Sequence, residues 1–391
     1  MEILIPYQRT SAELSLLLRL MQGDAKLPAE IDRERLRALI RKNRLEPMVA
    51  ERLDGAKCLN LATDEAAMMT MWQVSLLGHL GRLFAQQGIR ALSVKGPALA
   101  MEIYGTPGMR SNHDLDMLVD IIQLDQAVEL FIQDGWIWYE RDVLVTPKRK
   151  AEILHLQNHY LFTKGEMCVE LHWRLLPWDS DSFEQLWASR RQVMLGGAEI
   201  ATLGVVPQLH HLVYHGVRHG FHRMKWLADL AVLLPRHLED MEELWHSLAQ
   251  CGQETTLKMT WALLLSLREL DMPDVSFGGV TLKRTDDGVV VSGTSKAEPT
   301  LQQVRKLMDT LMPLLESEKD IEDTAPYYKY RDLLPAKFGD YMKRMVNRLR
   351  PRAIVWHWID LPDSLYWLYW PLRPVERVRR LLKDKSETKK D

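Results

Sequence analysis

The sequence predicts an α+β fold in which a unit of short strands and helices lies between two mostly helical regions. Apolar residues recur at helical spacing before residue 88 and again after residue 207, whereas the segment between them holds short apolar runs separated by Gly and Pro. With 391 residues the chain is long enough for about two or three domains. We expect an N-terminal helical region, an α+β core and a C-terminal helical domain at residues 1–85, 86–205 and 206–391.

Composition narrows the function classes. Lys plus Arg number 51 and Asp plus Glu number 53, which gives a formal net charge of −2. A general nucleic-acid binder normally has a clearly basic domain, so a nucleic-acid partner is not expected. Hydrophobic residues make up 46% and charged residues 27% of the chain, as in ordinary folded proteins, which excludes global disorder.

The three cysteines, Cys58, Cys168 and Cys251, lie far apart and in no metal-ligand spacing. A disulfide framework or a cysteine zinc site is therefore not expected, and a reduced, cytoplasmic chain fits. The N-terminus has no basic stretch followed by a long apolar run, so no signal peptide is expected. No apolar run reaches the roughly 18 residues that span a bilayer, so no transmembrane segment is expected.

The N-terminal region is expected to be helical over residues 11–54 and 65–88. In the second segment the apolar residues form one broad stripe, and Gly88 would end the helix because Gly tolerates the left-handed cap position. The α+β core then begins with a strand at Ala91–Val94. Pro97 is suited to open the helix that follows, since its missing N–H would be unpaired there in any case.

Further along the core the pattern predicts a strand at Leu115–Val119, a helix at Leu124–Gln133 closed by Gly135, and a strand at Trp136–Glu140. Two more β-like runs, His159–Thr163 and Cys168–Trp173, are joined by a Lys-Gly-Glu turn and form a hairpin.

The C-terminal domain is expected to be helical, with a hairpin or loop insertion near residues 275–295 around Asp287-Gly288. Near its end, Trp356–Leu372 is rich in Trp and Tyr. Two interpretations remain for that stretch: an interfacial membrane helix, or an arm that packs its aromatic side chains on the helical domain.

The most informative segment is Val94–Asp120, in which Asp114 and Asp116 lie two residues apart at the mouth of a strand. Side chains two apart on a strand point to the same face, and two carboxylates there repel each other unless a cation lies between them. Mg²⁺ prefers such oxygen ligands together with substrate phosphates. Glu170, flanked by apolar residues in a second strand-like run, is a candidate third carboxylate.

Phosphate-binding residues accompany these carboxylates. The Gly96 turn lets backbone N–H groups approach a phosphate, and Lys95 and Arg110 would neutralise phosphate oxygens. Two ions held about 3.5–4 Å apart by three carboxylates suit in-line phosphoryl transfer. An Asp-x-Asp pair alone also fits a solvated strand end, but its conjunction with the basic residues and the later Val-Glu-Leu-His-Trp favours the site.

These residues resemble the nucleotidyltransferase superfamily with the DNA polymerase β type fold, and within it the bacterial group described as uncharacterised nucleotidyltransferases. The resemblance is strongest over about residues 80–240. It rests on Lys95-Gly96, Leu99, Tyr104, Arg110, Asp114-Leu115-Asp116 with Leu118-Val119, Glu170-Leu171-His172-Trp173, His215, His219 and Lys225-Trp226-Leu227-Ala228-Asp229-Leu230.

The resemblance implies a nucleoside triphosphate bound with Mg²⁺ at the edge of a mixed sheet. Asp114 and Asp116 would hold two ions, for which Mn²⁺ is an alternative, and Glu170 would complete the catalytic site near the acceptor. An acceptor hydroxyl would attack the α-phosphate and pyrophosphate would leave. The acceptor is expected to be a small molecule, a sugar-like metabolite or a peptide.

Two other hypotheses stand beside this one, and the first of them follows from a departure from the superfamily. The usual Gly-Ser after the first strand is Gly96-Pro97 here, so the hydroxyl that meets the phosphates is missing. The chain is then alternatively a nucleotide-binding regulatory module without catalysis. The third hypothesis is a modifier that nucleotidylates (AMPylates) Ser, Thr or Tyr of a partner protein, in an antitoxin-like pairing.

Three groups of residues keep more than one interpretation at this point. His211, His215 and His219 share a helix face and form a zinc-binding stripe, ordinary packing, or a polar wall of the cleft with Arg218. Lys225 and Asp229 form an intrahelical pair or line the nucleotide site. His172, two residues after Glu170, contacts substrate or caps the sheet. For the nucleotide-binding set we take Lys95, Gly96, Arg110, His172, Lys225 and Asp229.

Overall fold

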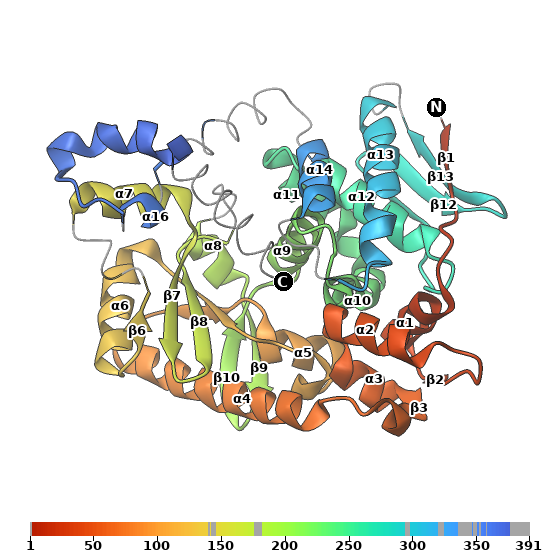
Figure 1. Ribbon diagram of the computed structural model, residues 1–391, viewed down its shortest axis with the longest axis horizontal. Helices are drawn as coiled ribbons and strands as arrows, with labels where there is room; N and C mark the ends of the chain where they lie inside the picture. The colour runs from red at the N-terminus through yellow and green to blue at the C-terminus, as the bar shows by residue number, and fades with distance from the viewer. Residues whose placement is uncertain are drawn as a thin grey trace, which may run out of the picture.

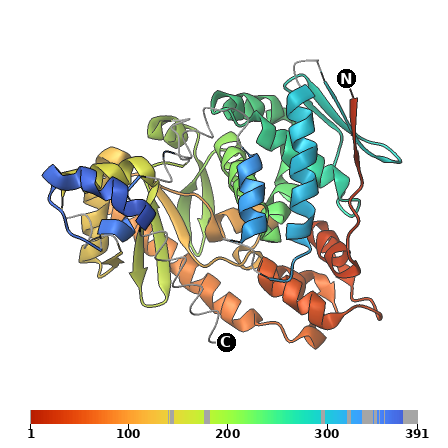
Figure 2. The same ribbon diagram turned by 45° about the horizontal axis from the view of Figure 1, so that its top comes forward.

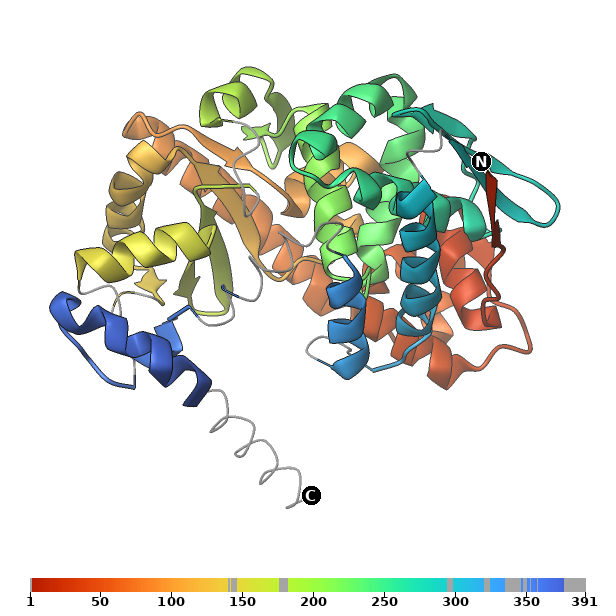
Figure 3. The ribbon, with the colours of Figure 1, turned by 90° about the horizontal axis from the view of Figure 1, so that it is seen from above.

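The computed structural model describes residues 2–139, 141, 146–175, 182–293, 298–319, 324–334, 346, 350–351, 353–356 and 358–375. In these residues short strands and many helices form an α+β fold, as the sequence predicts. Figure 3 shows the α+β unit on one side of the molecule and the helical unit on the other, with helices from both ends of the chain in the helical unit.

A seven-stranded mixed sheet forms the α+β unit (Figure 1). Its strand order is β6-β7-β8-β5-β4-β10-β9. The two pairs β5–β8 and β4–β10 are parallel and the other neighbours are antiparallel. The strands are β4 (Ala91–Ser93), β5 (Leu115–Val119), β6 (Ile137–Trp138), β7 (His159–Lys164), β8 (Met167–His172), β9 (Arg191–Leu195) and β10 (Ala198–Thr202).

The helices of this unit are α4 (Thr63–Gln86), α5 (Gly96–Tyr104), α6 (Leu124–Gln133), α7 (Pro147–Leu156) and α8 (Phe183–Ala188), with the 3-10 turns η2 (Pro107–Met109) and η3 (Ile121–Gln123). Figure 2 shows α4 running along one side of the molecule from the helical unit to the sheet. The ends of β5 and α6 agree with the predicted ends. The hairpin of β9 and β10 is absent from the sequence prediction.

The two faces of the sheet carry different side chains. Leu115, Met117 and Val119 of β5 point to the face covered by α4 and α6 and are buried there. Since strand side chains alternate, Asp116 points to the other face, which α9 and α10 of the helical unit approach. The sheet therefore presents its polar face toward the helical unit.

The helical unit combines segments from both ends of the chain. Its elements are α1 (Ala12–Gln22), α2 (Arg33–Asn43), α3 (Glu46–Arg52), η1 (Ala56–Leu59), α9 (Val205–Arg218), α10 (Met224–Leu233), η5 (Leu234–Asp240), α11 (Met241–Gln250), α12 (Glu254–Ser266), α13 (Glu298–Leu315) and α14 (Ala325–Leu333). One apolar core joins α1–α3 to α9–α13, so the two predicted helical flanks pack on each other.

The N-terminal region also contains strands, which corrects the expectation of a wholly helical lead-in. A short parallel pair joins β2 (Ala25–Lys26) to β3 (Leu53–Asp54). At the start of the chain, β1 (Glu2–Pro6) pairs antiparallel with β13.

The insertion expected near residues 275–295 is part of that sheet rather than an isolated hairpin. Its three strands are β11 (Val275–Phe277), β12 (Val280–Arg284) and β13 (Gly288–Gly293), and the strand order is β1-β13-β12-β11. Val289 and Val291 of β13 are buried against α12 and the rest of the helical core. Pairing with β1 therefore covers one edge of an otherwise exposed hairpin.

The aromatic arm near the C-terminus packs on the α+β unit, not on the helical domain as expected. It comprises α16 (Ala353–Trp356) and η7 (Asp363–Leu368), and its side chains Trp356, Tyr366 and Tyr369 belong to the core that α4, α6 and α7 share. The basic stretch that follows lies mostly outside the described residues. Among the described helices none has the length and apolar character needed to cross a membrane.

Candidate functional site

Asp116 and Glu170 lie side by side because β5 and β8 are parallel neighbours. The two residues are direct partners in the register, and His172 follows two residues farther along β8. All three therefore share the polar face of the sheet, while Met117 and Leu171 between them point into the apolar core. Local alternation together with this register places two carboxylates and an imidazole at one point.

Lys95 supplies a cation to the same point. It is the N-cap residue of α5, and its Nζ lies 3.2 Å from Oδ1 of Asp116. Burial lowers the pKa of Lys95, but the carboxylates of Asp116, Asp114 and Glu170 outweigh burial and leave the pKa raised. Burial in turn raises the pKa of Asp116, but Lys95 and His172 hold it well below the usual value. The pair is therefore an ammonium beside a carboxylate.

His172 links the two carboxylates. Its Nε2 lies 3.1 Å from Oδ1 of Asp116 and 3.2 Å from Oε2 of Glu170. Burial lowers the pKa of His172, but the hydrogen bonds to Asp116 and Glu170 outweigh it and raise the pKa to about 9. On the other side of the ring, Nδ2 of Asn158 lies 3.4 Å from Nδ1. His172 thus lines the site rather than merely capping the sheet.

Asp114 differs from Asp116 in having no hydrogen-bond or ion-pair partner within the described part of the chain. It directly precedes β5 and lines the same cavity. Burial, followed by the nearby charge of Asp116, raises its pKa. A carboxylate in this situation is stabilised by an added cation, because a like charge close by disfavours its ionised form.

Arg110 is anchored beneath the cavity by a carboxylate of the helical unit. Its Nε lies 2.9 Å from Oδ2 of Asp229 on α10, and its Nη1 bonds the amide oxygen of Asn112. The hydroxyl of Tyr104 donates to the other oxygen of Asp229 over 3.1 Å. Both oxygens of Asp229 are therefore engaged by protein groups.

This arrangement corrects the expected relationship between Lys225 and Asp229. They do not pair with each other: Nζ of Lys225 donates to the carbonyl oxygen of Ser111 over 2.9 Å and lines the cavity. Burial, followed by the charges of Arg110 and Arg44, lowers the pKa of Lys225 well below its usual value. Asp229 is fully buried, is not a cavity-lining residue, and contacts Arg110 and Tyr104.

Gly96 also lies outside the cavity lining. It is buried at the first position of α5 with φ +78°, a backbone conformation that favours glycine. A Cβ atom built there would lie 3.3 Å from Cδ2 of Leu115 on β5. Gly96 therefore sets the close approach of the turn after β4 to β5 and directs Lys95 toward Asp116.

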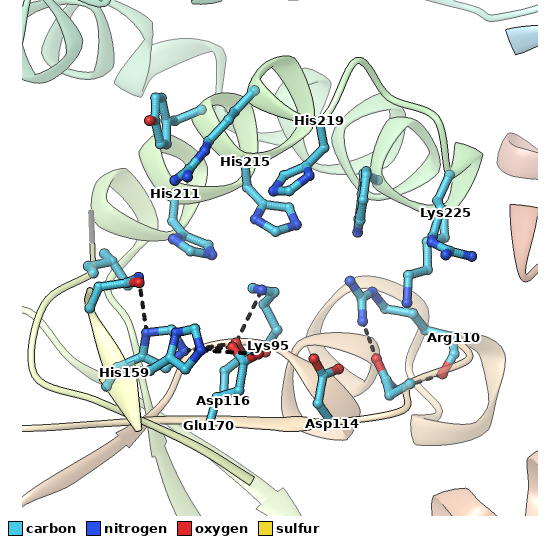
Figure 4. A pocket seen from close by; sticks show the side chains of 18 of the residues that line it. Lys95, Arg110, Asp114, Asp116, His159, Glu170, His211, His215, His219 and Lys225 are labelled. Carbon is cyan, nitrogen blue, oxygen red and sulfur yellow. Dashed lines mark hydrogen bonds and ion pairs between the residues drawn. The ribbon is translucent and has the colours of Figure 1, made fainter. Parts of the chain in front are cut away.

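The histidines of α9 form the opposite wall. Figure 4 shows His211, His215 and His219 pointing from α9 toward the sheet residues. Burial lowers the pKa of each well below the usual value, so these rings are neutral. Of the open interpretations the polar wall is the observed one, and these three rings are not among the metal-compatible groups of the described residues.

The sheet and the helical wall enclose a cavity of about 410 Å³, called here the central cavity (Figure 4). Its floor holds the carboxylates of Asp114, Asp116 and Glu170. Its walls and roof add the basic side chains of Lys95, Arg110, Lys225, Arg44, Arg218 and Arg223. A polyanion that also binds a cation matches this division, since its phosphates face basic groups while its cation faces the carboxylates.

Several lining residues are missing from the sequence prediction: Arg44, Asn112, Asn158, His159, Tyr214, Arg223 and Trp226. His159 carries a usable signal, because it starts the strand that forms the predicted hairpin with β8 and so lies opposite His172. Arg44 carries none, since it reaches the cavity from the helix end of α2 through a left-handed backbone turn at φ 56°.

Comparison with solved structures gives matches of low identity, two of which follow. The antibiotic-resistance factor ANT(2'')-Ia is 12% identical with a TM-score of 0.34, and the alignment covers 48% of this chain and 96% of that one. An antigenic nucleotidyltransferase-like protein from Paracoccidioides brasiliensis is 13% identical with a TM-score of 0.31, covering 51% and 94%. No curated protein matches the chain.

A match to a family model assigns the chain to a family. The model described as "Uncharacterised nucleotidyltransferase" matches residues 29–267, which is more than half of the chain. This span includes β4, β5, β7, β8, α9 and α10, and so all the elements that supply the carboxylates and the histidine wall of the central cavity. The chain belongs to the uncharacterised nucleotidyltransferase family and is a nucleotidyltransferase by family.

Proposed function

We propose that the chain is a Mg²⁺-dependent enzyme that moves a nucleoside monophosphate from a nucleoside triphosphate to a hydroxyl group, with release of pyrophosphate. One observation carries the proposal: the register of β5 and β8 pairs Asp116 with Glu170, and both carboxylates line one cavity with Asp114, opposite a basic and imidazole wall. A net charge of −2 supports a small molecule, a sugar-like metabolite or a peptide as acceptor rather than a nucleic acid.

The carboxylates fit hard divalent ions. Asp114 has a raised pKa beside Asp116 and, in the described chain, no partner of its own, which is the behaviour of a ligand that lacks its cation. Asp114 and Asp116 would hold two Mg²⁺ or Mn²⁺ ions, and Glu170 would complete the set. When bound, such ions neutralise charge on the transferring phosphoryl group.

The chain's own residues bind and orient the reactants. Lys95, Arg110 and Lys225 bind the phosphates, and Asp229 holds Arg110 in position from below. Gly96 acts indirectly, through the turn that directs Lys95 into the central cavity. The acceptor oxygen bonds to the α-phosphorus as the bond to pyrophosphate breaks, and Glu170 takes the hydroxyl proton.

The other two hypotheses remain as outcomes of the test. Pro97 at the position of the superfamily's Ser favours a binding module without catalysis, because the phosphate-binding hydroxyl is absent. A protein acceptor would make the chain a modifier of Ser, Thr or Tyr. The cysteines Cys58, Cys168 and Cys251 are free, which supports a reducing compartment, and we place the reaction in the cytoplasm.

Nucleotide binding is tested first, by thermal shift with ATP, GTP, CTP and UTP, with and without Mg²⁺. A ligand that binds only the folded chain raises the melting temperature by mass action. We expect a Mg²⁺-dependent shift that the double variant Asp114→Asn/Asp116→Asn loses. The matched control is Asp286→Asn/Asp287→Asn, which removes two exposed carboxylates outside the central cavity and should keep the shift.

Catalysis is tested by pyrophosphate release and by label from α-³²P-nucleotide. Asp116→Asn should abolish label transfer while the fold is retained, and full activity in that variant contradicts the proposal. Label on small molecules supports it, and label on a protein band supports the modifier. Nucleotide binding without label transfer to small molecules or to protein supports the nucleotide-binding regulatory module without catalysis. No shift with any nucleotide contradicts all three hypotheses.

A further inference from the structure

At one end of the central cavity a carboxylate lies between two imidazoles. Nε2 of His159 lies 3.6 Å from Oε1 of Glu170, and Nε2 of His172 lies 3.2 Å from Oε2 of the same residue. One ligand atom from each of these three residues lies within 4.8 Å of the other two. Ligands bonded to one ion at about 2.0–2.2 Å are separated by roughly 3–4 Å, so little movement is needed to enclose an ion.

The backbone, rather than a loop, sets these positions. His159 on β7 is the direct antiparallel partner of His172 on β8, and Glu170 on β8 is the direct parallel partner of Asp116 on β5. The four side chains therefore lie on one face of three neighbouring strands. Oδ1 of Asp116 lies 3.1 Å from Nε2 of His172, which makes it a fourth candidate ligand.

A second observation points to a ligand at this place. His211 on α9 is 4% exposed, and neither of its ring nitrogens has a hydrogen-bond partner within the described chain. Figure 4 shows its ring pointing from α9 into the space above His159 and Asp116. A buried polar ring with both nitrogens unbonded costs free energy unless something in the cavity bonds it.

The donor set selects the class of ion. Imidazole nitrogen suits zinc, iron, copper and nickel, whereas Mg²⁺ takes oxygen ligands and keeps several waters. We propose that His159, Glu170 and His172, with Asp116 as the fourth ligand, bind one transition-metal dication of the Zn²⁺ type. This site shares Asp116 with the oxygen-only pair formed by Asp114 and Asp116. The inference deepens the proposed function, with which it shares Asp116 and Glu170.

The test uses the full chain after treatment with a chelator and contains no nucleotide. Calorimetric titration with Zn²⁺ should show one ion per chain, bound at least about 100-fold more tightly than Mg²⁺. His159→Gln should weaken Zn²⁺ binding by at least about 10-fold. His215→Gln is the matched control, since it removes an imidazole of the same cavity outside the ligand set and should leave Zn²⁺ affinity within about 2-fold.

A second cluster among the described residues could bind the Zn²⁺ instead. His237, Glu239 and Asp240 also place their ligand atoms within 4.8 Å of one another. Loss of Zn²⁺ binding in His237→Gln but not in His159→Gln overturns the proposal, and so does Zn²⁺ affinity no higher than Mg²⁺ affinity.

A measurement on the unaltered chain removes any dependence on the folding of variants. X-ray absorption of the Zn²⁺-loaded protein should show imidazole nitrogen and carboxylate oxygen and no sulfur. A sulfur ligand from one of the cysteines overturns the proposal. If Zn²⁺ binds through His159 while no nucleotide binds, the proposed function fails and the metal site stands. If nucleotide binds while no Zn²⁺ binds through His159, the proposed function stands and the proposed metal site is overturned.

Discussion

Nε of Arg110 donates to Oδ2 of Asp229 over 2.9 Å, and the two side chains are only 3% and 0% exposed. The bond joins the segment before β5 to α10, and so connects the sheet that carries the carboxylates to the helical unit that carries the histidine wall. Tyr104 satisfies the second oxygen of Asp229. This buried pair holds together the two halves of the central cavity.

Replacing Asp229 with Ala should lower the free energy of unfolding by about 3–5 kcal/mol, because Arg110 would be left as a buried unpaired charge. Asp229→Asn should cost less, since an amide oxygen still accepts from the guanidinium. Urea unfolding measures both values. The control is Asp125→Ala, whose carboxylate pairs with Lys150 but is 73% exposed, and which should cost at most about 1 kcal/mol. Equal losses at Asp229 and Asp125 would contradict the structural role given to the buried pair.

Gly96→Ala should lower the free energy of unfolding by about 1–2 kcal/mol through its φ of +78° alone, with a further cost from the approach to Leu115. It should also weaken nucleotide binding, because Lys95 and the N-terminus of α5 move with this turn. Gly105→Ala is the comparison: φ there is +74°, but nothing lies within 4 Å of an added Cβ. We expect Gly105→Ala to lose stability and keep the nucleotide-dependent thermal shift. If both variants keep that shift, the turn does not shape the phosphate site.

One buried hydroxyl of the C-terminal arm bonds both to α7 and to the arm's own backbone. Oη of Tyr369 lies 2.7 Å from Nη2 of Arg149 on α7 and 2.7 Å from the N–H of Leu361, and it donates to the carbonyl oxygen of Ile359 over 2.8 Å. Tyr369→Phe removes the partner of the Leu361 N–H and of the Ile359 carbonyl, while Arg149 keeps its bonds to Asp360 and Leu361, and the change should cost about 1–3 kcal/mol.

The neighbouring Tyr366 provides the control for that prediction. Its hydroxyl is also buried but has no hydrogen-bond partner among the residues that the structure describes. Tyr366→Phe should therefore be neutral or stabilising, as removal of an unsatisfied polar atom predicts. Limited proteolysis of the arm, alongside urea unfolding, separates local release of the arm from global unfolding. Equal protease sensitivity of the two variants would argue against Tyr369 as the attachment point.

Local patterns predicted the elements that carry the carboxylates. The runs at β5 and α6 are bounded by residues with strong local preferences, such as Gly135 at φ +83°, so both elements have the predicted ends. Strand alternation likewise placed Asp114 and Asp116 together, because period 2 is a property of the backbone and needs no tertiary information.

Pairings between distant segments could not be predicted in the same way. Nothing in residues 2–6 identifies Val289 as a partner, although β1 and β13 are adjacent in the sheet. One interpretation of the aromatic arm was packing on the helical domain, but aromatic side chains do not specify which surface covers them: Tyr366 and Tyr369 are buried against the α+β unit, while Trp367 is 63% exposed. For the same reason the sequence did not identify Arg110 as the partner of Asp229: it shows the charge but not the group that pairs with it.

Acid should destabilise the chain partly through His210 on α9. This residue is 1% exposed, its Nδ1 bonds Oγ of Ser247 at 2.7 Å, and burial lowers its pKa to about 4. Unfolded, the same imidazole titrates near pH 6.5. Above pH 6.5 the imidazole of His210 is neutral in both the folded and the unfolded chain, so it adds no pH dependence to stability. Between about pH 6.5 and 4 only the unfolded chain takes up the proton, so stability falls with pH by about 2–3 kcal/mol at pH 4.5.

The measurement is the free energy of unfolding in urea at pH 8 and pH 4.5 for the wild type and His210→Gln. Other buried histidines also titrate, so the informative quantity is the free energy of unfolding of the wild type minus that of His210→Gln. This difference should shrink by about 2–3 kcal/mol on acidification. His246→Gln is the matched control, since that imidazole on α11 is 62% exposed and meets solvent in both states. A wild type and a His210→Gln variant that lose stability in parallel would show that His210 takes up its proton in the folded chain as readily as in the unfolded one.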